Sequence, residues 1–242
     1  MEEERYLLDL ARRAEKTGRP VFTDFLDPVQ AAAASRCAHE AGTDCVLFGG
    51  YPDAERQIAC FGSYGEEPEW PLRWLECRWN AKFASPGHRD FLGALMALGI
   101  KREALGDIIA EQDRAFLALH ASVAEYVASS LISAGRASLT CAWADGEAMR
   151  ERKLTLKEDE ITVMSMRLDA VVAAGANLSR AAAERLIVQG GVKIDHVPET
   201  RPDKRISEKC LLSIAGCGRL YILETCGTTR RGRLRIRIGR PY

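Results

Sequence analysis

Residues 166–197 constrain the fold more than any other stretch, because their apolar positions follow a helical repeat with clear breaks. Apolar residues recur at helical spacing from Leu168, and Gly175 provides a natural stop. Ser179 is placed to cap a second helix whose apolar side chains would lie on a core. A glycine pair then releases the chain into an expected strand at 192–197. The pattern therefore predicts helix, short loop, helix and strand.

Polar and basic side chains are left outside this expected core. They are Arg167, Ser179, Arg180, Arg185, Gln189 and Lys193. Guanidinium, ammonium and amide groups on a compact corner are suited to gripping a phosphate backbone. We therefore expect RNA binding here; the alternative is an ordinary helical hairpin with solvated arginines.

The same spacing resembles the alpha-L RNA-binding motif, a domain named after a small-subunit ribosomal protein. The matching residues are Arg167-Leu168-Asp169, Ser179-Arg180, Ala183, Leu186-Ile187, Gln189-Gly190 and Val192-Lys193-Ile194. The sequence departs from the motif at Asp195-His196, where such domains often carry Asn-Gly, the pair that favours a tight hairpin turn. The resemblance implies an RNA-binding domain and leaves the conformation of that turn open.

Charge is segregated along the 242 residues, although the net charge is zero. Residues 165–242 hold 15 Lys and Arg against 7 Asp and Glu, a net charge of +8, and the first 164 residues carry −8. A basic end within a neutral chain is typical of a protein that binds nucleic acid at that end.

The last expected strand carries a second basic feature. Arg233, Arg235 and Arg237 alternate with Leu234, Ile236 and Ile238. A period of two places the arginines on one face of a strand and the aliphatic side chains on the other. We expect a stripe that faces phosphates, the alternative being a solvated outer face. Further strands are expected at 210–214 and 219–224.

Three regions are predicted, giving an α+β protein with domains at 1–72, 73–160 and 161–242. The first is a small α/β domain that reads as helix, turn, helix and two strands at 45–49 and 58–61, with Pro28 in the first turn of its second helix. The second is expected to contain strands at 75–83, 107–111, 115–120 and 137–143 and helices at 90–98 and 122–133. Along the chain this gives the order βαββαβ, which is that of ferredoxin-like and RNA-recognition (RRM) domains. The third is the basic alpha-L domain.

RNA-recognition domains display aromatic side chains on their sheet for base stacking. The strands expected in the middle region offer Trp79, Phe83, Phe116 and Trp143 without the usual aromatic signature. These rings fit a hydrophobic core better than a base platform.

The upstream regions resemble one family, the YlmH-type proteins. The matching stretches are Thr23–Pro28, Phe48–Tyr51, Ala54–Arg56, Gly87–Leu95, Leu98–Glu103 and Leu105–Ile108. The resemblance covers essentially the whole chain and implies a bacterial RNA-binding protein that acts on the large ribosomal subunit. For this family it implies rescue of subunits blocked by peptidyl-tRNA, within ribosome-associated quality control, with large-subunit ribosomal RNA and tRNA or peptidyl-tRNA as partners.

Within those stretches, His88 and Arg89 stand near the expected start of a helix, where they could contact RNA or hold the preceding loop. Asp90 falls in the first turn, where its charge suits the helix dipole. Gly99 can end that helix, and Gly106-Asp107 is expected to turn the chain into the next strand.

Several classes of protein are excluded. No segment approaches the roughly 20 apolar residues of a membrane span, and the N-terminus lacks a signal-peptide pattern, so we expect a cytoplasmic protein. The eight cysteines contain no C-x-x-C pair, which favours buried free thiols in a reducing compartment over a metal site. No cofactor is expected.

Catalytic signatures are missing as well. The chain has no phosphate-binding loop, no H-E-x-x-H and no complete nucleophile elbow, so we expect no enzyme and no catalytic residue. The enzymatic rival is a pseudouridine synthase, because such enzymes often carry an alpha-L domain. A cell-division adaptor is a further rival, but it would leave the +8 module unexplained.

Overall fold

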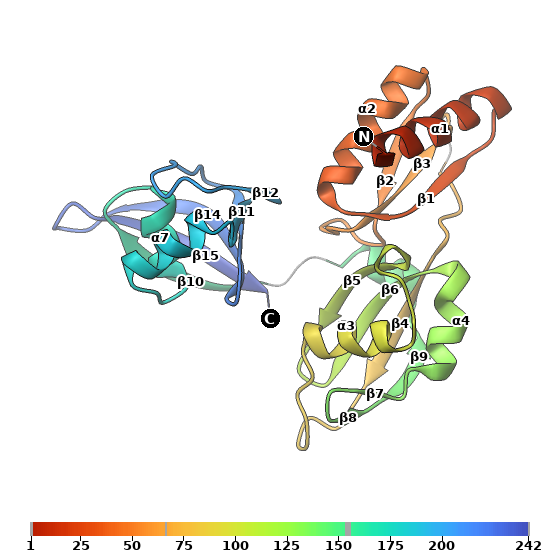
Figure 1. The fold of residues 1–242 in the computed structure, drawn as a ribbon. Helices are drawn as coiled ribbons and strands as arrows, with labels where there is room; N and C mark the ends of the chain where they lie inside the picture. Colours follow the sequence, from red (N-terminus) through yellow and green to blue (C-terminus); the bar gives the residue numbers. More distant parts are fainter. Residues whose placement is uncertain (1, 66, 153–155, 242) are drawn as a thin grey trace. The chain divides into compact units, whose positions relative to one another are not determined.

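A computed structural model describes residues 2–65, 67–152 and 156–241 and divides the chain into two compact units, 1–153 and 154–242 (Figure 1). Both units combine helices with antiparallel sheets, which confirms the expected α+β class. Among the described residues, no helix is long and apolar enough to cross a membrane.

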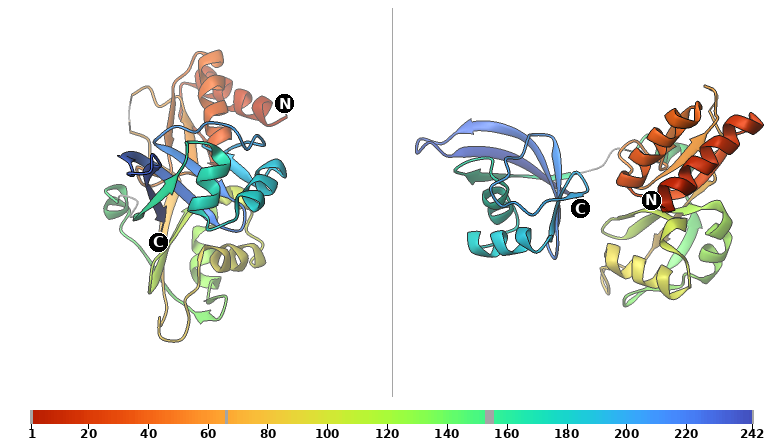
Figure 2. Two further views of the ribbon diagram at one scale, coloured as in Figure 1. Left: turned by 90° about the vertical axis from the view of Figure 1, so that its left-hand side faces the viewer. Right: turned by 45° about the horizontal axis from the view of Figure 1, so that its top comes forward.

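The first unit opens with a small α/β layer. Its elements are α1 (Glu2–Thr17), β1 (Val21–Leu26), α2 (Pro28–Ala41), β2 (Cys45–Phe48) and β3 (Gln57–Phe61), with strand order β1-β3-β2. Helices α1 and α2 lie side by side (Figure 2, red and orange) and pack on the sheet around Leu7, Ala34 and Phe61. Asp27 caps α2 by accepting hydrogen bonds from the backbone N–H groups of Val29 and Gln30, and Pro28 lies in the first turn of this helix as expected.

The sequence analysis expected only a turn between the first two helices and did not predict strand β1, which lies there in the structure. Its apolar alternation is interrupted by Thr23 and Asp24, and its pairing with β3 shifts register between Phe22 and Phe25. The buried Thr23 hydroxyl accepts a hydrogen bond from the Ala59 backbone N–H at 2.9 Å. A strand that buries a hydroxyl does not show the regular two-residue repeat that identifies strands in a sequence.

The middle of the first unit has the predicted ferredoxin-like order. Its elements are β4 (Leu72–Arg78), α3 (His88–Ala97), η1 (Arg102–Ala104), β5 (Leu105–Ala110), β6 (Arg114–His120), α4 (Ala121–Ser130), the ribbon β7 (Ser133–Ala134) and β8 (Ala137–Ser138), β9 (Thr140–Trp143) and α5 (Gly146–Arg150). The strand order β5-β6-β4-β9 is that of a βαββαβ fold. Helices α3 and α4 cover one face, around Leu75, Phe91 and Leu117.

Two local predictions in this domain are wrong. The strand expected over 75–83 ends at Arg78, because Asn80 forms a turn in which its side chain accepts from the Lys82 N–H at 3.0 Å; Phe83 is 85% exposed beyond it. Gly106 and Asp107 do not turn the chain but lie inside β5, where the register with β6 is interrupted.

The opposite face of this sheet is covered by the N-terminal layer. Trp74 and Phe116 pack there with Phe25, Tyr51 and Ile58 in one core. These rings therefore join the first two domains and are not available as a base platform.

A buried polar network reinforces the same contact. The Asp107 carboxylate accepts hydrogen bonds from the Tyr51 hydroxyl at 2.9 Å and from the Glu55 N–H at 2.8 Å. The Arg56 guanidinium donates to the carbonyls of Leu105 at 2.8 Å and Phe25 at 2.6 Å. Burial lowers the pKa of Arg56. The stretches at 48–56 and 105–108, which resemble the YlmH family, therefore connect the N-terminal domain to the middle domain.

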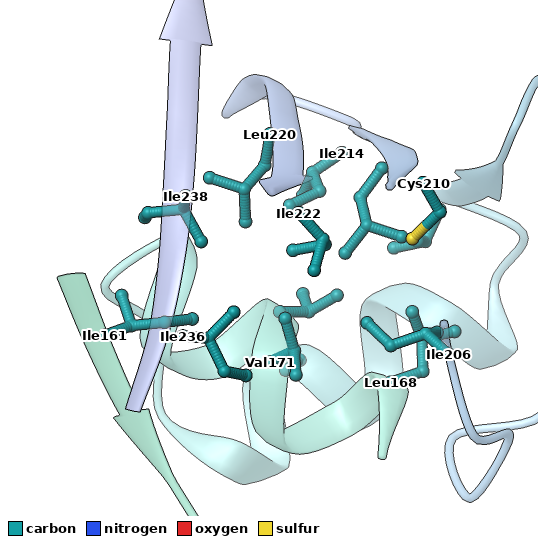
Figure 3. Packing of buried hydrophobic residues seen from close by; sticks show 14 of the residues in the cluster. Ile161, Leu168, Val171, Ile206, Cys210, Ile214, Leu220, Ile222, Ile236 and Ile238 are labelled. Carbon is teal, nitrogen blue, oxygen red and sulfur yellow. The ribbon is translucent and has the colours of Figure 1, made fainter. Parts of the chain in front are cut away.

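The second unit is a six-stranded sheet with two helices. Its elements are β10 (Leu156–Val163), α6 (Leu168–Gly175), α7 (Arg180–Val188), β11 (Val192–Ile194), β12 (Val197–Pro198), β13 (Cys210–Ile214), β14 (Gly218–Thr228) and β15 (Leu234–Pro241), in the order β10-β15-β14-β13-β11-β12. Figure 3 shows the core between the helices and the sheet, which includes Leu168, Val171 and Ile222. The domain boundary expected between 160 and 161 falls inside β10, whose partner β15 follows it by about seventy residues.

Candidate nucleic-acid interface

The corner formed by α6 and α7 is positioned by the residues that predicted it. Leu168, Val172 and Ile187 are fully buried in the core. The Ser179 hydroxyl accepts a hydrogen bond from the Ala182 N–H at 3.2 Å, which confirms the expected cap. A Cβ on Gly175 would lie 2.3 Å from a Leu220 methyl carbon, so a larger residue there would force the buried Leu220 side chain to move.

Asp169 anchors two of the predicted RNA-binding arginines. This carboxylate is fully buried, and it accepts hydrogen bonds from Arg167 Nη2 at 2.8 Å and from Arg180 Nη2 at 2.9 Å. The Ala170 backbone N–H donates to it at 2.7 Å. Both arginine side chains remain open to solvent, with 39% and 53% of their area exposed, respectively. The Asp169 carboxylate therefore fixes one edge of each guanidinium group, while the remaining N–H groups can donate to a ligand.

The ionisation of Asp169 follows from these contacts. Burial alone would raise its pKa, but the hydrogen bonds from Arg167 and Arg180 outweigh that effect and lower the pKa to about 2. The hydrogen bond to Asp169 also raises the pKa of Arg167. At neutral pH the corner therefore holds one buried anion under two outward-facing cations.

Three other predicted residues, Arg185, Gln189 and Lys193, are exposed on α7 and β11. Neither Arg185 nor Lys193 forms an ion pair among the residues that the structure describes. Their charges are thus uncompensated, unlike those of Arg167 and Arg180.

Two basic residues at this corner were missed by the sequence reasoning. The Leu168 N–H donates to the Lys204 carbonyl at 2.8 Å, and Arg205 forms a backbone bridge with Arg167. Lys204 and Arg205 are exposed, and the described ranges contain no ion-pair partner for either. The basic run at 201–205 was visible in the sequence, but its place beside α6 depends on tertiary contacts.

The turn after β11 forms although Asn-Gly is missing. Asp195 and His196 have φ values of +46° and +70°, and Ile194 pairs directly with Val197. The Asp195 side chain accepts a hydrogen bond from the Leu211 N–H at 2.8 Å. An aspartate that tolerates the left-handed region and gains this bond replaces the usual asparagine.

The arginine stripe of β15 has the predicted alternation, with Ile236 and Ile238 fully buried on the other face. Carboxylates of β10 and β14 lie beside the arginines: Arg235 pairs with Glu160 at 2.9 Å, and Arg237 pairs with Glu224 at 2.9 Å. These strands place compensating charges next to the stripe, which reduces its attraction for phosphate. Arg233 has no such partner in the described part of the chain.

His88 and Arg89 are exposed at the first turn of α3, in the other unit. Asp90 accepts a hydrogen bond from the Gly87 N–H at 2.8 Å and so caps this helix. His88 and Arg89 stay a secondary prediction of RNA contact.

The expectation of buried free thiols holds for four of the eight cysteines, whereas Cys217 is exposed and Cys45, Cys141 and Cys226 are half-buried. All eight cysteines are free, and Cys37, Cys60, Cys77 and Cys210 are buried. Within the described residues, no group of three or more His, Cys, Asp or Glu side chains is arranged to hold a metal ion.

A helix–loop–helix corner on an antiparallel sheet, with basic side chains outside, defines an S4-domain (alpha-L) protein. Residues 166–209 match the S4 domain model, residues 66–146 the model of a candidate RNA-binding domain in YlmH, and residues 1–62 the model of the YlmH N-terminal domain.

A curated relative matches along nearly the whole chain. It is the "Ribosome-associated protein quality control protein P2" of Bacillus subtilis, 33% identical over 232 residues, which cover 95% of this chain and 90% of the relative. A solved structure, "Cell division protein ylmH from Streptococcus pneumoniae", has a similar fold over 62% of this chain and 95% of its own, with a TM-score of 0.51 and 22% identity. The chain belongs to the YlmH family.

Proposed function

We propose that this protein binds structured ribosomal and transfer RNA through its C-terminal unit, as part of ribosome-associated quality control in the bacterial cytoplasm. The S4 match and the relative's name support RNA binding and this process. The observation that carries the proposal is the corner where Asp169 orients Arg167 and Arg180 outward, beside the uncompensated charges of Arg185 and Lys193. Exposed, oriented cations suit phosphate contacts with little sequence preference.

The target is a free large ribosomal subunit that retains peptidyl-tRNA. A protein that binds the subunit interface can do so only when the small subunit does not cover that surface. The bound tRNA offers further phosphates for the basic side chains. The S4 unit would contact both RNAs, with Ser179 and Gln189 adding polar contacts beside the cations.

Sedimentation of the tagged protein through a sucrose gradient tests this target. We expect co-migration with free large subunits, enriched in those that hold peptidyl-tRNA. Migration with small subunits alone, or with no ribosomal particle, would contradict it.

The phosphate contacts are tested by the double variant Arg185→Ala/Lys193→Ala. It should bind structured RNA more weakly, and the slope of log affinity against log salt should fall by about 0.7–0.9 for each lost contact. The matched control is Arg12→Ala/Arg36→Ala, because these exposed arginines on α1 and α2 pair with glutamates. Equal salt slopes for the parent and the double variant would rule out the assignment.

The protein is proposed to act without catalytic turnover. Mapping of pseudouridine in ribosomal RNA from cells with and without the gene distinguishes this from the synthase alternative. A modification that disappears on deletion and returns with the purified protein would overturn the proposal.

A further inference from the structure

A pocket of about 320 Å³ lies in the first unit, where β4 begins and β9 ends. The proposed function makes no use of it. Its volume falls at the lower end of the range typical of small-molecule sites. Aromatic rings and two arginines form most of its lining: Phe48, Trp70, Arg73, Trp74, Trp143 and Arg150.

Planar groups lie close together around this pocket. The Arg73 guanidinium carbon lies 3.5 Å from the centre of the Trp143 ring, and that of Arg150 lies 5.1 Å from the centre of the Phe48 ring. The rings of Phe48 and Trp70 are 5.3 Å apart at their centres. Flat rings covered by guanidinium planes are surfaces on which another flat heterocycle can stack.

Outside the pocket, carboxylates hold the two guanidinium groups. Arg73 pairs with Glu125 of α4, and Arg150 pairs with Glu67. These glutamate side chains are exposed, at 75% and 69%. Each arginine is thus oriented over its ring, and its charge is partly compensated by this carboxylate. Glu69 adds a further carboxylate to the lining, so the rings contribute more to binding here than net charge does.

A buried donor in the wall lacks an acceptor. Trp74 is 3% exposed, and its indole N–H has no hydrogen-bond partner within the described ranges. Gly50 lies against this indole with φ of +97°, and a Cβ there would come within 2.7 Å of the ring nitrogen. This nitrogen has less than 1 Å² of accessible area, so Trp74 contributes its ring to the wall and donates no hydrogen bond to a molecule in the pocket.

The usual place for base stacking is closed in this domain. RNA-recognition domains stack bases on the exposed face of the sheet, but here Phe25 and Tyr51 cover that face at Trp74 and Phe116. At the end of the sheet, by contrast, Trp143 remains 37% exposed.

We infer that this pocket binds an unpaired nucleobase of RNA, stacked among Trp70, Trp143 and the Arg73 plane, with the arginines beside its phosphates. The protein then holds RNA at a second place, separate from the α6–α7 corner. This inference rests on the proposed function in taking RNA as the ligand. A proline-rich peptide also docks on aromatic grooves, but it has no phosphate for the two arginines.

The test compares two RNAs with the full chain: a blunt hairpin whose strands are joined by a non-nucleotide linker, so that every base is paired, and the same hairpin with a five-nucleotide unpaired tail. The tail should raise the affinity of the parent about tenfold, as expected for one or two stacked bases. Trp143→Ala should lose this gain and Trp143→Phe should keep most of it. Tyr126→Ala is the matched control, an exposed aromatic on α4 outside the pocket.

The blunt hairpin separates this inference from the proposed function. Its binding should be equal in the parent and in all three aromatic variants, and it should weaken only in Arg185→Ala/Lys193→Ala. The proposed function fails if that double variant binds the blunt hairpin normally. The pocket inference fails if the tail adds nothing to the parent, or adds as much to Trp143→Ala.

Photocrosslinking provides a readout that a folding defect would not produce. A 4-thiouridine in the tail should crosslink to peptides that contain Trp70 or Trp143. Crosslinks confined to residues 156–241 would overturn the inference. So would quenching of tryptophan fluorescence by a proline-rich peptide but not by the tailed RNA.

Discussion

Replacement of Asp169 by asparagine should lower both the stability of the second unit and its affinity for RNA. The substitution keeps the size of the side chain but removes the buried negative charge that Arg167 and Arg180 share. An amide group also presents N–H donors toward one of the two guanidinium groups, which are donors themselves. We therefore expect a loss of stability together with a loss of arginine orientation.

The size of the effect follows from the pKa of Asp169. The folded protein lowers this pKa from its ordinary 3.8 to about 2, and each pKa unit corresponds to about 1.4 kcal/mol. The ionised carboxylate therefore contributes about 2 kcal/mol at neutral pH, the partial exposure of both arginines keeping the figure at the lower end. Because the folded pKa is depressed, this contribution is complete above about pH 4 and is lost as the pH falls through 2.

RNA affinity should fall as well. Immobilising a long side chain on binding costs about 0.5–1.5 kcal/mol in conformational entropy. Asp169 already holds Arg167 and Arg180 in place, so this entropy is not lost when RNA binds. Without Asp169, the two arginines together lose about 1–3 kcal/mol, so binding should weaken roughly five- to 150-fold while the protein keeps its fold.

Amide hydrogen exchange is the suitable assay for stability. All four tryptophans lie in the first unit, so tryptophan fluorescence does not report on the second. The opening free energy of amides in α6 and α7 should fall by about 2 kcal/mol in Asp169→Asn at pH 7. Exposed Glu184, 3.8 Å from Arg180, provides the control: Glu184→Gln should change it by less than about 0.5 kcal/mol.

Equal opening free energies in Asp169→Asn and Glu184→Gln would refute this reasoning. The parent should also lose protection in α6 between pH 4 and pH 2 to a greater extent than Asp169→Asn. Parallel pH profiles would show that the carboxylate is not the group that links protonation to stability.

Further predictions concern other parts of the chain. Gly50→Ala should destabilise the first unit by about 2 kcal/mol or more in thermal unfolding, because a Cβ at φ +97° would collide with Trp74; an unchanged melting temperature would contradict this. Exposed Cys217 should react with a maleimide at pH 7.5 long before Cys60, whose pKa burial raises to about 11, and equal rates on mass-spectrometric mapping would refute the assigned burial. Arg237→Gln should change RNA affinity less than threefold, because adjacent carboxylates already compensate this charge, and a tenfold loss would restore the stripe as a phosphate site.

Local sequence patterns determined much of this protein. The α6–α7 corner, the Ser179 cap, Pro28 in the first turn of α2 and the alternation along β15 are all present where their patterns predicted them. Each depends on residues a few positions apart, and such spacing is a direct consequence of helix and strand geometry.

The partners of the basic residues were decided by tertiary structure. Nothing near Arg237 in the sequence shows that Glu158 and Glu224 lie beside it, because β10 and β14 join β15 from distant positions. The alternation placed the arginines on one face but could not reveal the charge of that face as a whole.

The first two domains also show that a sequence pattern does not reveal what covers a strand face. Trp74 and Phe116 are buried because a separate layer, with Phe25 and Tyr51, covers their side of the sheet. A strand's periodicity shows which residues share a face, but whether that face meets RNA, water or another domain depends on contacts between segments far apart in the chain. The sequence alone determined the order of most of the elements, although not β1, and the basic character of the C-terminal end. Tertiary packing decided which aromatic and charged groups remain free to bind.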